Sequence, residues 1–168
     1  DTVIDLKYHG FIPDTYIPDP RNKIEVYKRI GGIRSEEEIA DVVAGIEDRY
    51  GKLPALIEKL VALSRLRVLA SGLRVVSIFE KPGRIEIEFS TESRVRPELL
   101  PKLLEKENDR LKLVPGRPEL LLVELPKDPV SSENPELEEK IGLVMGLLRK
   151  IQEKEAAPPP PGAVKRHG

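Results

Sequence analysis

Apolar residues near the start of the chain recur at helical spacing and predict a first helix. Ile24, Tyr27 and Ile30 are three residues apart, so we expect them to form its buried face. The helix begins at Pro20, because proline is favoured where the backbone N–H would lack a helical partner. Asp19 is placed to cap this helix, and a pair of glycines after Ile30 ends it.

Two further helices are predicted in the first half of the chain. The second is bounded by a capping box, Ser35 and Glu38, and by Gly51, which is expected to form a left-handed C-cap. Its predicted buried residues are Ile39, Val42, Val43, Ile46 and Tyr50. The third helix runs from Pro54 to about Ala70, and its apolar residues cover more than one stripe. We therefore expect the third helix to be central and buried on several sides.

Beyond residue 72 the pattern changes to that of strands. Residues 84–90 alternate strictly between charged and apolar side chains, and Pro82-Gly83 fits a type II turn just before them. The predicted strands are 2–8, 73–80, 84–90, 110–114 and 119–125. A short helix is predicted at 98–106, between the last two pairs of strands.

The order of these elements predicts an α+β fold. The strands cluster after a run of helices, so we expect the N-terminal helices to pack on a small, mostly antiparallel sheet of hairpins. A last helix, which docks on this core, is predicted from five apolar residues at 4-3-4-3 spacing: Leu137, Ile141, Val144, Leu148 and Ile151. We expect one domain over residues 1–155 and a disordered, proline-rich tail over residues 156–168.

Composition narrows the class of protein. Lys and Arg number 28 and Asp and Glu 29, so the chain lacks the basic excess that is typical of a duplex-DNA module. The absence of cysteine rules out disulfides and thiolate metal sites and suits the cytoplasm. No apolar run reaches the roughly 18 residues of a membrane span, so no membrane contact is expected. The chain enters a strand directly after Asp1, from which we infer a fragment of a longer parent protein.

The loop before the first helix contains the triplet Ile-Pro-Asp twice. Its carboxylates, Asp14 and Asp19, are candidates for a catalytic pair or a metal site. The favoured interpretation is structural: Asp19 caps the helix, Asp14 occupies a turn, and the prolines stiffen an extended strap. Ile12 and Ile17 are expected to anchor this strap to the core.

Signatures of catalysis and of cofactor binding are absent from the sequence. No GxxxxGKS/T phosphate-binding loop occurs, and the histidines, His9 and His167, are far apart in the chain. Glu86 and Glu88 share one face of a strand and are expected to be solvated. We therefore expect neither enzyme activity nor a cofactor. A small enzyme is only the third hypothesis, since no nucleophile–base pair is recognisable.

Two charged surfaces are candidates for binding a partner. The first is the end of the second helix, which is either a solvated terminus or a polar docking patch: Glu47, Asp48 and Arg49. The second is the first helix, 20–30, which would act as a nucleic-acid-contacting module if its basic residues bound phosphates: Arg21, Lys23, Lys28 and Arg29.

Three stretches together resemble the C-terminal domain of the bacterial transcription-repair coupling factor. They are YIPDPRNKIEVYKRI at 16–30, EDRYGKLP at 47–54 and LSRLR at 63–67, and the organisation is similar over residues 2–125. The resemblance implies a parent that is an ATP-dependent DNA translocase, which displaces stalled RNA polymerase at lesions and recruits the nucleotide-excision machinery. It also implies that the ATPase motor and its DNA contacts lie elsewhere in the parent.

The resemblance further implies a regulatory, autoinhibitory role without catalysis. In the family, this last domain packs on a distant N-terminal module resembling UvrB, hides the surface that binds UvrA, and restrains the motor until polymerase is engaged. The family's contact stretch reads Glu-x-x-Asp-Arg, then Phe or Tyr, then Gly. Asp48 and Arg49 match it and are the candidate interdomain contacts. Gly45 replaces the leading Glu, and Glu47 lies on another helix face, so one polar contact is expected to be missing.

Overall fold

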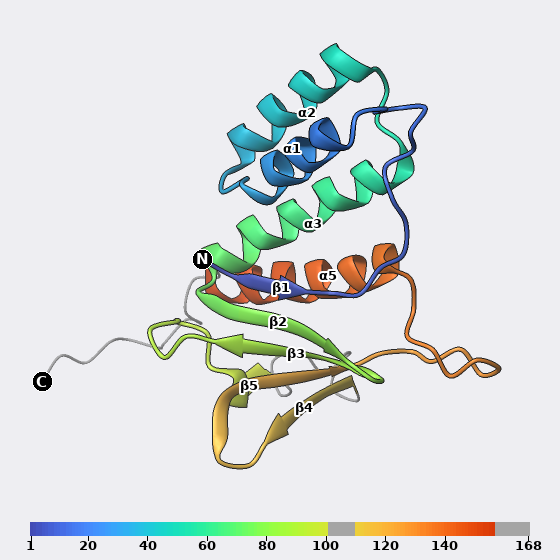
Figure 1. Cartoon of the computed structure of the whole chain (residues 1–168). Coiled ribbons are helices and arrows are strands. Elements are labelled where there is room, and N and C mark those ends of the chain that lie inside the picture. The colour runs from blue at the N-terminus through green and yellow to red at the C-terminus, as the bar shows by residue number, and fades with distance from the viewer. Residues whose placement is uncertain (101–109, 157–168) are drawn as a thin grey trace, which may run out of the picture.

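The computed structural model describes residues 1–100 and 110–156 and confirms the α+β fold (Figure 1). The helices are α1 (Pro20–Gly31), α2 (Glu36–Tyr50), α3 (Ala55–Gly72), the 3₁₀ helix η1 (Pro97–Leu99) and α5 (Leu137–Ala156). The strands are β1 (Val3–Asp5), β2 (Val75–Lys81), β3 (Arg84–Phe89), β4 (Leu111–Val114) and β5 (Arg117–Glu124). Each predicted strand is present, although β1 is much shorter than the predicted 2–8.

The strands form one sheet in the order β1-β2-β3-β5-β4. β1 lies parallel to β2, and the other neighbouring pairs are antiparallel, so the sheet is mixed and mostly antiparallel. Ile78 on β2, Ile87 on β3 and Leu121 on β5 are partners in register and are fully buried. Gly83 has a φ of 76°, the positive value that the second central position of the predicted type II turn requires.

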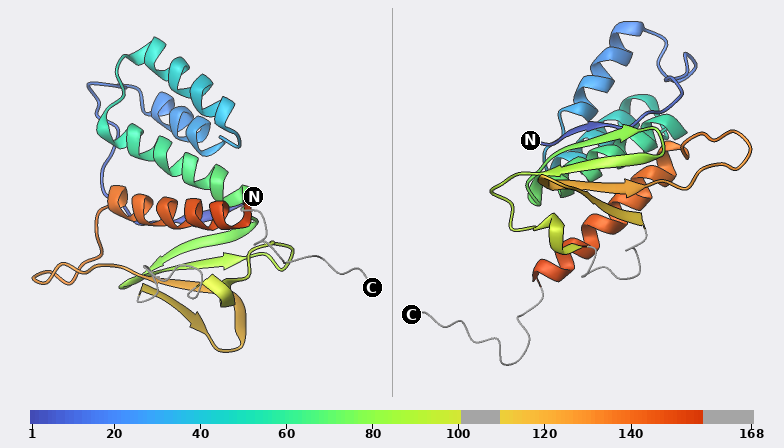
Figure 2. Two further views of the ribbon diagram at one scale, coloured as in Figure 1. Left: turned by 180° about the vertical axis from the view of Figure 1, so that it is seen from behind. Right: turned by 90° about the horizontal axis from the view of Figure 1, so that it is seen from below.

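One face of the sheet is covered by α3 and α5, and α1 and α2 lie on the far side of α3 (Figures 1 and 2). Leu66 and Ala70 of α3 belong to an apolar cluster with the sheet and α5. Ile57 and Leu60 of α3 belong to a second cluster with α1, α2 and the strap. The third helix is therefore central and buried on two sides, as its wide apolar arc predicts.

The last helix docks on the sheet through both apolar and charged residues. All five of its predicted apolar residues are buried. Nζ of Lys140 also lies 2.6 Å from Oε1 of Glu80 on β2, and each of these side chains is only 3% exposed. Glu80 accepts two more hydrogen bonds, each of 2.8 Å, from N of Lys7 and from Nδ2 of Asn134. This network joins α5, β2, the chain after β1 and the loop before α5.

The strap, which contains the two Ile-Pro-Asp triplets at 12–14 and 17–19, has a structural role, as the favoured interpretation predicts. Ile12 and Ile17 are fully buried, so they anchor the strap to the helical cluster. Oδ1 of Asp19 accepts a hydrogen bond of 2.8 Å from N of Arg21 and thus caps α1. Asp14 lies in a turn, and its carboxylate forms an ion pair with Lys23 of α1.

The buried face predicted for α1 is wrong in one residue. Ile24 is 54% exposed, whereas Val26 and Ile30 are buried. A spacing of three residues drifts by about 60° around a helix at each step, so Ile24 and Ile30 cannot share a face. The helix predicted at 98–106 begins as η1 at Pro97, but residues 101–109 lie outside the described residues, as do residues 157–168 of the predicted tail.

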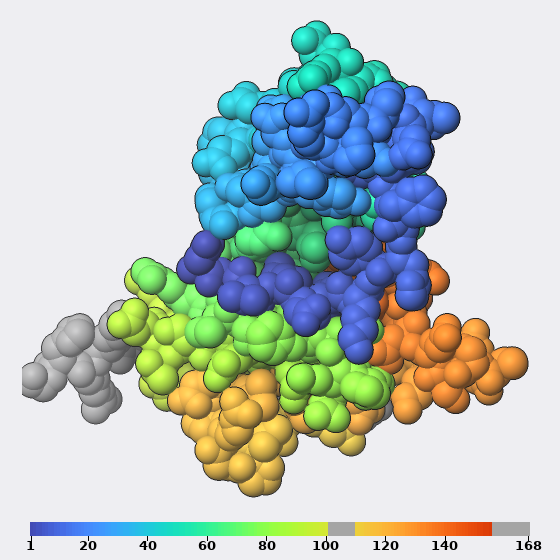
Figure 3. Space-filling view, in the orientation of Figure 1, coloured from blue at the N-terminus to red at the C-terminus, as the bar shows by residue number. Residues whose placement is uncertain are grey.

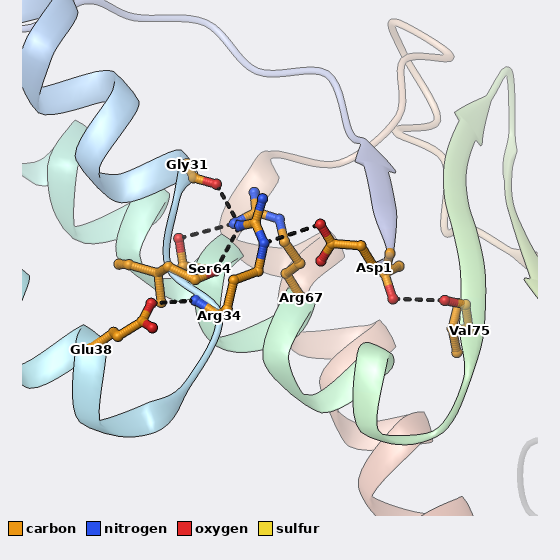
Figure 4. A network of polar contacts seen from close by, with 9 residues as sticks. Asp1, Gly31, Arg34, Glu38, Ser64, Arg67 and Val75 are labelled. Atoms are coloured by element: carbon orange, nitrogen blue, oxygen red, sulfur yellow. Dashed lines mark hydrogen bonds and ion pairs between the residues drawn. The ribbon is translucent and has the colours of Figure 1, made fainter.

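The start of α2 is fixed by a network of hydrogen bonds around Arg34 (Figure 4). Nη1 of Arg34 donates to the carbonyl oxygen of Gly31 at 2.7 Å, and Nε contacts Oδ2 of Asp1 at 3.1 Å. Oγ of Ser35 accepts from N of Glu38 at 3.3 Å, as the capping box predicts. The carboxylate of Glu38 accepts from N of Arg34 at 2.8 Å, whereas a capping box implies N of Ser35 as the donor. The base of α2 is therefore tied to α1 and to the N-terminal strand.

Candidate docking surface

The predicted polar patch lies at the C-terminal end of α2, which we call the α2 tip and define as residues 47–51. This end of the helix stands at the far end of the molecule from the sheet (Figures 1 and 3). The side chains of Glu47, Asp48 and Arg49 are all exposed. Among the helices of the described residues, none has both the length and the apolar character that a membrane span needs.

The backbone beneath the α2 tip is held firmly. N of Gly51 donates to the carbonyl oxygen of Glu47 at 2.8 Å, and the hydroxyl of Tyr16 donates to the carbonyl oxygen of Gly51 at 2.7 Å. The rings of Tyr16 and Tyr50 are 5.8 Å apart between centroids. Gly51 has a φ of 91°, in the region that favours glycine, but its ψ of −166° is not that of the predicted left-handed cap. The strap thus supports the tip through Tyr16.

The charges of the tip remain available to a partner. Within residues 1–100 and 110–156, neither Asp48 nor Arg49 forms a side-chain hydrogen bond or an ion pair. The guanidinium of Arg49 lies 5.0 Å from the centroid of the Tyr50 ring, a cation–π contact that leaves its N–H groups unused. Burial raises the pKa of Tyr16, and the negative charge of Glu47 adds to this shift.

Gly45 lies one helical turn before Asp48 and Arg49 and faces α1. A Cβ atom built on Gly45 would lie 2.8 Å from Nη2 of Arg29, so the guanidinium of Arg29 packs directly against the α2 backbone there. The position at which the resemblance implies a glutamate is therefore covered by a cation.

The four basic residues predicted as phosphate contacts do not act as one group. Arg21 forms an ion pair with Asp19 at 3.4 Å, and Lys23 pairs with Asp14. Lys28 is exposed, and Arg29 is directed toward α2. At about 100° per residue, Lys23 lies on the opposite side of α1 from Arg21. This arrangement gives less support to a nucleic-acid interface than four free cations on one face would.

One hollow of the described surface has the Glu80–Lys140 pair in its lining. It has a volume of about 360 Å³ and is lined by Lys7, His9 and Asn134 among others. Glu80 and Lys140 are already satisfied by each other and by neighbouring polar groups, so neither is available as a nucleophile or a base. Across the described ranges, no group of three or more His, Asp or Glu side chains is arranged to hold a metal ion.

The surface just described lies within a stretch that matches a known family. The model of the TRCF domain matches residues 6–100, which is more than half of the chain. The chain belongs to this family. The match includes the strap, α1, the α2 tip and α3, and it confirms the resemblance to the C-terminal domain of the transcription-repair coupling factor.

Curated relatives and a solved structure are consistent with this assignment. The chain is 32% identical over 113 residues to a transcription-repair-coupling factor of Borreliella burgdorferi and 33% identical over 114 residues to that of Escherichia coli. Each alignment covers 67% of this chain but only 10% of the relative, so this chain spans about a tenth of the length of these two relatives. A crystal structure of the C-terminal domain of transcription-repair coupling factor has the same fold, with a TM-score of 0.65 and 22% identity over 92% of this chain and 95% of that one.

The roles of two residues on this TRCF domain surface are not predicted from the sequence. Tyr16 stands between the two Ile-Pro-Asp triplets, and only the fold brings its ring to Tyr50 and its hydroxyl to Gly51. Arg29 is assigned by sequence to a phosphate-binding set, yet it packs against Gly45. Gly45 itself could have indicated this contact, because a glycine inside a helix often marks a place where another group packs closely against the backbone.

Proposed function

We propose that this chain is the regulatory, non-catalytic C-terminal domain of a transcription-repair coupling factor, an ATP-dependent DNA translocase that removes stalled RNA polymerase at lesions. In this proposal residues 1–155 act as one domain, and the α2 tip covers the UvrA-binding surface of the parent's UvrB-like module. The observation that supports it is the tip itself: Asp48 and Arg49 are exposed, lie next to a backbone carbonyl that is hydrogen-bonded to Tyr16, and have no charged partner among the described side chains.

The proposed mechanism is competition by a tethered surface. A domain joined to its target by a linker experiences an effective concentration of up to roughly 1 mM, so an intrinsic Kd of roughly 0.1 mM would keep about nine-tenths of the molecules closed. Weak polar contacts therefore suffice, and they permit release. Truncating one member of a desolvated charge pair costs about 2 kcal/mol or more. A loss of about 2 kcal/mol would leave only about a quarter of the molecules closed.

The test is Arg49→Glu in the intact parent. We expect tighter UvrA binding and a higher ATPase rate without polymerase, because the reversed charge opposes closure. Arg94→Glu is the matched control, since Arg94 is an exposed arginine in the loop after β3, remote in sequence from the tip. If Arg49→Glu leaves UvrA affinity and ATPase at the levels of the control, the proposal is wrong.

A further inference from the structure

The contact between Arg29 and Gly45 places a cation on the docking surface. Nη2, Cζ and Nη1 of Arg29 would lie 2.8, 3.7 and 3.6 Å from a Cβ atom on Gly45. All three atoms are close, so the guanidinium packs on the α2 backbone, and a side chain at position 45 would displace it from there. Residues three and four positions apart are neighbours on a helix surface, so Asp48 and Arg49 are the next residues along the same side of α2.

The guanidinium of Arg29 has donors to offer. In the part of the chain that the structure describes, Arg29 forms no hydrogen bond and no ion pair, and its side chain is exposed. A planar guanidinium presents five N–H donors in a fixed fork, which suits a carboxylate held by two parallel hydrogen bonds. The packing against Gly45 restricts its orientation, which reduces the entropy that binding would otherwise cost.

We propose that Arg29 is a third charged contact of the docking surface and binds a carboxylate on the module that this surface covers. This inference rests on the proposed function. Charge complementarity favours a carboxylate over a nucleic-acid phosphate, because Glu47 and Asp48 carry negative charge on the same end of α2 and would repel a polyanion. The partner therefore presents an acidic side chain to Arg29 and a basic one to Asp48.

The proposal is tested in the intact parent with UvrA binding as the readout. Arg29→Ala removes the donors, and Gly45→Ala moves the guanidinium off the α2 backbone. We expect either variant to weaken the contact that keeps the parent closed about tenfold. The fraction of open molecules then rises, which improves the apparent affinity for UvrA about fivefold. Lys28→Ala is the control, because Lys28 is the neighbouring exposed cation on α1 and should leave that affinity unchanged.

Gly45→Ala also separates docking from folding. Alanine is the better helix former, so its melting temperature should equal or exceed that of the wild type while closure weakens. A second step tests the carboxylate: Arg29→Glu should open the parent, and one Asp→Lys or Glu→Lys change on the covered module should restore closure.

The outcomes distinguish this inference from the proposed function. If Arg49→Glu opens the parent but Arg29→Ala and Gly45→Ala do not, Arg29 is not a contact and the proposed function stands. If Arg29→Glu opens the parent and no charge reversal restores closure, the assignment of a carboxylate is wrong. If none of these variants, Arg49→Glu included, changes UvrA binding, both proposals are overturned.

Discussion

Replacing Lys140 by alanine should destabilise the domain severely, because Lys140 neutralises a buried carboxylate. The side chains of Glu80 and Lys140 are each 3% exposed, and their charged atoms are 2.6 Å apart. Removing one member of such a pair leaves the other buried and uncompensated, at a cost of about 3–5 kcal/mol. Glu80 keeps its hydrogen bonds from Lys7 and Asn134 in the variant, so we expect a value near 3 kcal/mol.

A loss of this size is a large part of the roughly 5–15 kcal/mol by which a folded domain is stable. It corresponds to a fall in melting temperature of roughly 6–12 °C for a chain of this length. The assay is urea unfolding followed by circular dichroism at pH 7. Lys154→Ala is the matched control, an exposed lysine on the same helix, and it should change stability by no more than about 0.5 kcal/mol.

A double variant isolates the charge from the packing. Glu80→Gln with Lys140→Met keeps an acceptor for Lys7 and fills a similar volume without ionised groups. It should recover part of the stability that Lys140→Ala loses, because it removes the uncompensated buried charge, whereas Nδ2 of Asn134 loses its acceptor at position 80. A loss below about 1 kcal/mol for Lys140→Ala, or a double variant as unstable as the single one, would refute the reasoning.

Four smaller predictions concern single polar groups. Burial would raise the pKa of Glu80, but hydrogen bonds from Asn134, Lys140 and Lys7 outweigh it, so the pKa is lowered. The stability that ionised Glu80 contributes should therefore be lost as the pH falls below about 4.3, the pKa of a glutamate in the unfolded chain, and urea titrations at several pH values measure this loss. Ser35→Ala removes the N-cap of α2 and should cost about 1 kcal/mol in the same assay. Tyr16→Phe loses the hydrogen bond to Gly51 and should lower the free energy of unfolding by about 1 kcal/mol. The hydroxyl of Tyr50 is buried without a hydrogen-bond partner among the described residues, so Tyr50→Phe should be neutral or stabilising; a loss equal to that of Tyr16→Phe would contradict this difference.

Local signals predict the elements of this fold well. The bounds of α2 follow from Ser35 and Gly51, and the docking of α5 follows from its 4-3-4-3 apolar residues, because caps and apolar spacing act within a few residues of the chain. Ile24 is mispredicted for the same local reason: a spacing of three fits a helix for one turn and drifts beyond it.

Contacts between distant segments could not be predicted from the pattern. Glu80 and Lys140 are 60 residues apart, and each would be taken for a surface charge until β2 and α5 are packed together. The contact of Arg29 with Gly45 depends on where α1 crosses α2, which no spacing in the sequence reveals. By contrast, the exposure of Asp48 and Arg49 is consistent with their place at the end of an amphipathic helix.

The central proposal, that a charged helix end covers another part of the same parent protein, is tested most directly by calorimetric titration of this chain against the parent's UvrB-like module. The wild-type chain should bind, and Asp48→Ala/Arg49→Ala should bind at least tenfold more weakly. Glu153→Ala/Lys154→Ala, which removes two exposed opposite charges from α5, should bind like the wild type. Absence of binding by the wild type, or equal affinity of the Asp48→Ala/Arg49→Ala variant, would contradict the proposal.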